Sequence, residues 1–151
     1  MNIYIATDHA GYELKNKLVP FIEELGHTVI DCGADEYSEM DDYPDFIRKA
    51  ALEVSKAVDN DKSTSRAIIV GGSGQGEAMV ANRAKGVRAM VYYGGDIEIV
   101  RLGREHNDAN ILSLAARFIS EEEAKVAVQT FLETPFSEEE RHIRRIKKIE
   151  Q

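Results

Sequence analysis

Short apolar segments alternate with longer amphipathic segments along the chain, and this alternation constrains the fold more than any other feature. The apolar segments are too short for anything but buried strands, and the segments between them have helical spacing. The expected strands cover residues 2–7, 27–32, 66–70, 87–92 and 109–114, and the expected helices cover residues 12–25, 43–58, 77–84, 97–104, 121–132 and 137–150. This pattern predicts an α/β fold: a three-layer α/β/α sandwich, Rossmann-like or flavodoxin-like, with a five-stranded parallel sheet.

The length of 151 residues fits one domain, residues 1–151, since a domain typically contains roughly 100–200 residues. The longest aliphatic run, residues 67–70, is far shorter than the ~20 residues of a membrane-spanning helix. No basic region followed by an apolar stretch opens the sequence, so we expect no secretory signal and a cytoplasmic location. Cys32 is the single cysteine and can form neither an internal disulfide nor a cysteine-based zinc site, which fits a reducing compartment.

The net charge of −8 argues against general attraction to nucleic acid or to an anionic membrane, and we expect neither as a partner. Residues 141–148 nevertheless contain five basic side chains and no acidic one. This local cluster favours a small anionic ligand. A solvated basic helix face explains the same residues equally well on charge alone.

A glycine-rich loop at residues 71–76 follows an expected strand and precedes an expected helix. Such a loop can turn its backbone N–H groups toward an anion, so we expect it to bind an oxyanion or a phosphate. It lacks the Lys-Ser/Thr ending of a P-loop and the spacing of a dinucleotide-binding loop. A plain tight turn is the alternative, although four glycines in six residues exceed what a turn requires. The loop residues expected to contact a ligand are Gly72, Ser73, Gly74, Gln75 and Gly76.

Glu77 follows this loop, in the first turn of the expected helix. An acidic side chain at that position commonly does no more than complement the helix dipole. Beside a glycine loop, however, the carboxylate is placed to move a proton on a substrate whose developing oxyanion faces the loop amides. Glu77 is therefore the candidate general base.

Two further polar segments contain candidate histidines. Asp8 and His9 end the first expected strand, where α/β proteins place ligand-binding residues, although a structural Asp8 would only cap the next helix. His106 and Asn107 fall between an expected helix and the fifth expected strand, and we expect them, like Asp8 and His9, at the carboxyl ends of the strands. A histidine in a polar loop is usually inert, but imidazole titrates near neutrality, so His106 is a candidate acid or base.

Arg141 and Arg145 are four residues apart and therefore share one face of the last expected helix. Two guanidinium groups at that spacing can clamp one phosphate. Ser137 is placed to cap this helix, and the roles of Arg144 and Lys148 on the neighbouring face stay open. Cys32 is not a candidate nucleophile, because no base lies near it in sequence and a lone cysteine is usually a small buried hydrophobic residue.

Taken in order, these segments closely resemble the type B ribose-5-phosphate isomerases, a family that also includes galactose-6-phosphate and allose-6-phosphate isomerases. The resemblance runs from Met1 almost to the C-terminus. The motifs that carry it are Asp8-His9-Ala10-Gly11, Asp42-Tyr43-Pro44, Gly71 through Glu77, Ala81-Asn82, Arg104 through Asn107, and Arg141 through Arg145.

The resemblance implies interconversion of an aldose phosphate and a ketose phosphate through a cis-enediolate, without a metal or a nucleotide cofactor. By similarity, the amides from Gly72 to Gly76 would hold the enediolate oxygen. His106 would donate the proton that opens the furanose ring. The residues implied to contact the sugar are Asp8, His9 and Asn107.

The phosphate would be bound, by the same resemblance, by Arg117, Arg141 and Arg145, so the C-terminal helix would supply phosphate-binding residues. Members of the family work as homodimers, and sometimes as tetramers, with sites completed by residues of both subunits. The resemblance therefore implies a homodimer or tetramer with shared active sites.

One position divides the family into two subgroups. Many members carry a cysteine base just before the glycine run, where this chain has Gly71. The other subgroup has a glutamate directly after the loop, and Glu77 matches it. The resemblance therefore implies that Glu77 is the base.

The interconversion of ribose 5-phosphate and ribulose 5-phosphate is the leading hypothesis. A hexose 6-phosphate of the allose or galactose type is the alternative within the same chemistry, because one added carbon lengthens the substrate by only ~1.5 Å. From a different class, the chain could be a non-catalytic module that binds a phosphorylated metabolite. Glu77 and His106 speak against that module, since binding alone requires neither a base nor a ring-opening acid.

Overall fold

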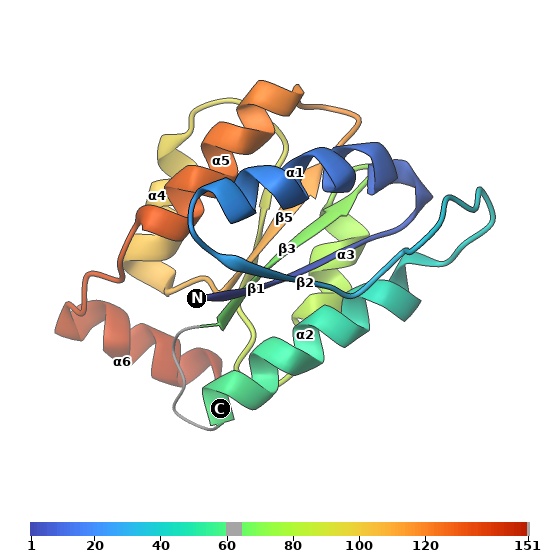
Figure 1. Ribbon diagram of the computed structural model, residues 1–151. Helices are drawn as coiled ribbons and strands as arrows, with labels where there is room; N and C mark the ends of the chain where they lie inside the picture. Colours follow the sequence, from blue (N-terminus) through green and yellow to red (C-terminus); the bar gives the residue numbers. More distant parts are fainter. Residues whose placement is uncertain (60–64, 151) are drawn as a thin grey trace.

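A computed structural model describes residues 1–59 and 65–150 and shows a sheet with helices on both faces (Figure 1). The strands are β1 (Asn2–Thr7), β2 (Thr28–Asp31), β3 (Ser65–Gly71), β4 (Ala89–Tyr92) and β5 (Ile111–Ala115). The helices are the 3-10 helix η1 (His9–Gly11), α1 (Tyr12–Glu24), α2 (Tyr43–Asp59), α3 (Gln75–Ala81), α4 (Glu98–Asn107), α5 (Glu121–Glu133) and α6 (Glu140–Ile149). The predicted α/β/α sandwich with a five-stranded parallel sheet is confirmed for the described residues. Residues 60–64 and 151 of the predicted domain lie outside them.

The strands lie in the order β2-β1-β3-β5-β4, and each neighbouring pair is parallel. A flavodoxin-like sheet has the order 2-1-3-4-5, whereas β5 here lies between β3 and β4. The flavodoxin-like alternative is therefore wrong, and the Rossmann-like one is confirmed. None of the described helices is long and apolar enough to cross a lipid bilayer.

The sheet is buried on both faces because side chains along each strand point alternately to the two helix layers. Ile3 and Ile5 of β1 belong to a core with residues of α1 and α5, whereas Ala6 belongs to a second core with residues of α2. Burying one such isoleucine side chain stabilises a fold by roughly 1.5–3 kcal/mol. The two cores thus hold the strands, and with them the loops at the strand ends, in a fixed arrangement.

The carboxyl ends of β1 and β3 lie side by side, and this placement sets the candidate site. From β1 the chain continues toward β2 on one side, and from β3 it continues toward β4 and β5 on the other, which is the crevice where open α/β sheets bind ligands. The segment after β5 joins the same edge, because Arg117 donates a backbone hydrogen bond to Gly72 at 3.1 Å.

The glycine loop is shorter than the sequence predicts. Helix α3 begins at Gln75 rather than Glu77, because Gly74 takes a left-handed conformation with φ +73° directly before it. The same helix ends at Ala81 rather than at residue 84. There the Asn82 side chain exchanges two hydrogen bonds with the backbone of Ala89, at 2.8 and 3.0 Å, and ties the helix end to β4.

Two helix boundaries near the C-terminus also differ from the prediction. Helix α4 continues through Asn107, because Asp108 caps it in a left-handed conformation with φ 45° and donates its backbone N–H to Arg104. His106 and Asn107 therefore lie in the last turn of a helix and not in a polar loop. The predicted capping by Ser137 is wrong: α6 begins at Glu140, and the backbone N–H of Ser137 bonds Glu105 of α4 at 3.1 Å.

Candidate active site

A pocket of about 440 Å³ lies at the carboxyl edge of the sheet, where the sequence predicts a site. We call it the carboxyl-edge pocket. The loops after β1, β3 and β5 supply most of its lining, and α2 and α3 supply the rest. The lining residues are Asp8, His9, Ala10, Tyr43, Gly72, Ser73, Gly76, Glu77, Arg117 and Phe118.

Glu77 lines this pocket with only 5% of its surface exposed. Its carboxylate lies against Gly71, so closely that a Cβ atom on Gly71 would overlap it. The carboxylate therefore occupies the space that a side chain at position 71 would fill. Burial raises the pKa of Glu77, the negative charge of Asp8 raises it further, and the backbone N–H of Glu77 lowers it. A carboxylate in this setting is a stronger base than one in water.

Neighbouring side chains pack closely against the glycine loop beside Glu77. Ser113 of β5 donates a hydrogen bond to the Gly74 carbonyl at 2.6 Å and holds the turn against the sheet. A Cβ atom on Gly76 would lie 2.7 Å from the Tyr43 hydroxyl oxygen, so a larger residue there would displace the Tyr43 side chain. Of the five predicted loop contacts, Gly72, Ser73 and Gly76 line the pocket, whereas Gly74 and Gln75 do not.

Asp8 and His9 enter the pocket from the end of β1, as the sequence predicts. Asp8 also caps η1, because its side chain accepts a hydrogen bond from the Ala10 backbone N–H at 3.0 Å. The Nδ1 atom of His9 lies 2.7 Å from Oδ1 of Asp41, a residue that sequence reasoning missed. In the sequence, Asp41 is marked only as one of two acidic residues just before α2, and acidic residues in such a loop are usually exposed to solvent.

Asp8, His9 and Asp41 also form the one cluster among the described residues with spacing suited to a metal ion, since one ligand atom from each lies within 4.8 Å of the others. The hydrogen bond between His9 and Asp41 is enough to explain why these residues lie so close together. The independence from metal implied by the family resemblance stays a prediction.

The remaining candidates do not reach this pocket within one chain. Helix α4 runs from the carboxyl end of β4 back to the start of β5, so its last turn lies at the opposite, amino edge of the sheet. His106 and Asn107 are in that turn. The expectation that they lie at the carboxyl ends of the strands is therefore wrong.

Helix α6 packs beside α4 at the same amino edge (Figure 1). We call His106, Asn107, Arg141 and Arg145 together the α4–α6 cluster. The His106 ring stacks on the ring of His142, with centroids 4.3 Å apart and planes 10° from parallel. Burial and the neighbouring His106 lower the pKa of His142. Arg141 and Arg145 are exposed, and Nε of Arg141 donates to Glu139 at 2.7 Å.

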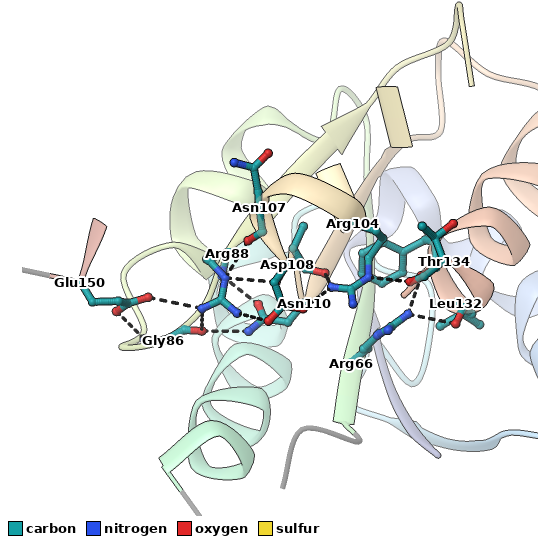
Figure 2. A network of polar contacts seen from close by, with 12 residues as sticks. Arg66, Gly86, Arg88, Arg104, Asn107, Asp108, Asn110, Leu132, Thr134 and Glu150 are labelled. Carbon is teal, nitrogen blue, oxygen red and sulfur yellow. Dashed lines mark hydrogen bonds and ion pairs between the residues drawn. The ribbon is translucent and has the colours of Figure 1, made fainter. Parts of the chain in front are cut away.

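Figure 2 shows the polar network that holds the last turn of α4. Nε of Arg88 donates to the backbone oxygens of Asn107 and Asp108 at 3.0 and 3.1 Å. The Asp108 carboxylate accepts hydrogen bonds from Arg88 and Arg104, both at 2.8 Å. Arg88 also reaches Glu150, the residue after α6, at 3.4 Å. One arginine thus joins the last turn of α4 to the end of α6.

The sequence model of the Ribose/Galactose Isomerase family matches residues 3–149. Ribose-5-phosphate isomerase B of Mycolicibacterium paratuberculosis is 40% identical over 146 residues, which cover 97% of this chain and 87% of that protein.

Solved structures agree with the sequence relatives. The crystal structure of ribose-5-phosphate isomerase B from Mycoplasma genitalium with bound ribulose 5-phosphate has a TM-score of 0.90 and 37% identity, over 99% of this chain and 93% of that one. Type B ribose 5-phosphate isomerase of Trypanosoma cruzi has a TM-score of 0.88 and 35% identity, over 99% and 94% of the two chains. From the family match and these relatives together, the chain belongs to the Ribose/Galactose Isomerase family.

Proposed function

We propose that this protein interconverts ribose 5-phosphate and ribulose 5-phosphate, with Glu77 as the base. The observation that carries the proposal is the buried Glu77 carboxylate, with its raised pKa, in the same pocket as Gly72, Ser73 and Gly76. Proton transfer beside a carbonyl requires a base and hydrogen-bond donors for the developing oxyanion in the same pocket.

One base is enough for the isomerisation, because the same group can remove the proton and return it. Glu77 takes the proton from C2 of the open-chain aldose, and the negative charge develops on O1. The carboxylic acid then returns that proton to C1 while the O2 hydroxyl proton passes to O1, which gives the ketose. Removing one well-placed oxyanion donor typically lowers a rate by about 10²–10³. The loop after β3 supplies several such N–H groups.

The relatives favour the pentose phosphate over a hexose phosphate. The Mycolicibacterium paratuberculosis relative is a ribose-5-phosphate isomerase B, and the Mycoplasma genitalium protein binds ribulose 5-phosphate. We propose the same substrate pair here. Asp8 and His9 would contact the sugar from the end of β1, and Arg117 would bind the phosphate from the loop after β5.

The α4–α6 cluster belongs, in this proposal, to the pocket of a second copy. In a homodimer, or a tetramer built from such dimers, the outward-facing Arg141 and Arg145 would close the partner's pocket on the phosphate. His106 and Asn107 would meet the same substrate and open its furanose ring. The separation of the two regions within one chain supports this arrangement, because a single copy supplies each pocket with only half of the expected residues.

The test of the activity is a coupled assay with ribose 5-phosphate, allose 6-phosphate and galactose 6-phosphate. We expect the highest kcat/KM with ribose 5-phosphate, and a higher value with a hexose phosphate would refute the substrate assignment. Glu77→Gln should still bind a phosphorylated inhibitor but lose turnover. A non-catalytic binding module would show no turnover in the unaltered protein. A cytoplasmic location stays a prediction, which cell fractionation tests.

A further inference from the structure

We propose that Asp41 is a positioning residue that fixes the imidazole of His9 in the carboxyl-edge pocket. The inference deepens the proposed function and rests on it, since His9 is taken to contact the substrate. It assigns a role to a residue in the loop between β2 and α2, far from His9 in sequence.

A single oxygen of Asp41 contacts both the ring Nδ1 and the backbone N–H of His9. Oδ1 lies 2.7 Å from the ring Nδ1 and accepts a hydrogen bond from the His9 backbone N–H at 3.1 Å. An ionised carboxylate only accepts hydrogen bonds, so the proton of this contact is on Nδ1. The Nε2 atom is then the ring nitrogen that remains for a ligand in the pocket.

The burial of Asp41 is difficult to explain by its own bonding. Its side chain is only 9% exposed, and Oδ2 is buried without a hydrogen-bond partner among the described residues. A buried polar atom left without a partner lowers the stability of the fold. A role in orienting His9 would explain why an aspartate is found at this buried position despite its unpartnered oxygen.

The other contacts of the His9 ring are too long to hold it in one orientation. The Tyr37 ring meets His9 edge-on, with centroids 6.4 Å apart, and Oδ2 of Asp8 lies 3.8 Å from Nδ1. Asp8 is too distant to replace Asp41 as the hydrogen-bond acceptor. Loss of the Asp41 carboxylate would therefore free the ring to rotate and to exchange its tautomers.

Steady-state kinetics separate this positioning from a purely structural role. Asp41→Ala should raise KM about 10-fold and change kcat less than about threefold, because a loosely held ring weakens substrate binding. Asp41→Asn retains an oxygen acceptor and should stay within about threefold of the unaltered protein. Glu39→Gln, an exposed carboxylate in the same loop, is the matched control and should change nothing. An Asp41→Ala protein with the KM of this control would overturn the proposal.

The ¹⁵N chemical shifts of the imidazole test the same claim without any activity. The signal of His9, identified by its loss in His9→Asn, should show a protonated Nδ1 in the unaltered protein. A bare Nδ1 would overturn the proposal even if Asp41→Ala fails to fold. If no sugar phosphate is isomerised but Nδ1 is protonated and depends on Asp41, the proposed function fails and the positioning stands.

Discussion

The carboxyl-edge pocket and the α4–α6 cluster both contain expected site residues, but they are built in opposite ways. In the pocket, the carboxylate of Glu77, the proposed base, is buried and leaves no space for a side chain on Gly71. In the cluster, Arg141 and Arg145 are exposed on a helix that protrudes beside α4. The difference fits the proposed division of roles, in which one chain buries the base and presents outward the cations that would bind the phosphate in another copy's pocket.

Removal of the base should have the largest effect on the pocket. Glu77→Gln keeps the size of the side chain and removes its basicity, so we expect kcat to fall by about 10²–10⁴ with little change in fold. Single-turnover and steady-state rates measure this loss. Retention of more than a tenth of the activity would assign the proton transfer to another residue.

Displacement of the base should have the next largest effect. Gly71→Ala places a Cβ atom where the Glu77 carboxylate lies, so we expect kcat to fall by on the order of 10² as the carboxylate moves. Gly72→Ala is the comparison within the same loop, because the nearest atoms to its Cβ belong to the Arg117 side chain, at 3.4 Å, and leave the Glu77 carboxylate in place, so kcat should fall less than in Gly71→Ala. Equal losses in the two variants would show that the space beside Gly71 has no special importance.

The cluster should affect substrate binding more than the chemical step. Arg145→Ala removes one side of the proposed phosphate clamp, so we expect KM to rise about 10-fold with kcat less changed. Arg144→Ala, on the neighbouring face of α6, is the control and should leave KM within about threefold. A larger effect at Arg144 would assign the phosphate contact to the other face of the helix.

Disrupting the polar network in Figure 2 should lower the stability of the fold more than it lowers the catalytic rate. Arg88→Ala removes a guanidinium that contacts Asn107, Asp108 and Glu150, so we expect the free energy of unfolding to fall by about 1–3 kcal/mol. Arg101→Ala breaks only an exposed pair with Glu98 on α4 and should change stability by less than about 1 kcal/mol. Thermal unfolding compares the two variants, and equal melting temperatures would show that the network stabilises the fold no more than the exposed pair does.

The fall in activity on the acid side of the pH profile should report Glu77 in the pocket. The base acts in its ionised form, so kcat/KM should fall as pH drops through the raised pKa of Glu77, above the ~4.3 of an ordinary glutamate. Because the folded state holds that proton more tightly than the unfolded chain, stability from this group falls as pH rises through the raised pKa. Glu77→Gln should remove this part of the stability profile. A fall in kcat/KM centred on the pKa of an ordinary glutamate would contradict the effect of burial on Glu77.

Most of the pocket could be predicted from the sequence because each signal for it is local. The end of β1, the glycine loop and Glu77 are each recognisable within a few residues, and parallel strands bring their carboxyl ends together. Asp41 could not be predicted in this way, since 32 residues separate it from its partner His9.

The residue types of the α4–α6 cluster and its edge of the sheet both follow from the sequence, but the extent of α4 does not. His106 and Asn107 precede a parallel strand, and residues between a helix and the next parallel strand lie at the amino edge of the sheet, so the expectation of the carboxyl edge was an avoidable error. The end of α4 is set by the left-handed Asp108 and by Arg88 and Arg104, whose contacts are long-range or conformational. The order of β4 and β5 has no local signal either, which explains why a flavodoxin-like sheet remained an open alternative.

The most direct test of the account is complementation between two variants that each have a low kcat/KM. One chain carries Glu77→Gln, which lowers kcat, and the other carries Arg141→Ala with Arg145→Ala, which raises KM, and differently tagged copies are purified as mixed dimers. In each mixed dimer one pocket has an intact base and the intact arginines of its partner, so kcat/KM at low substrate concentration should return to about half that of the unaltered dimer. Mixed dimers no more active than the average of the two parent variants would contradict a site shared between copies.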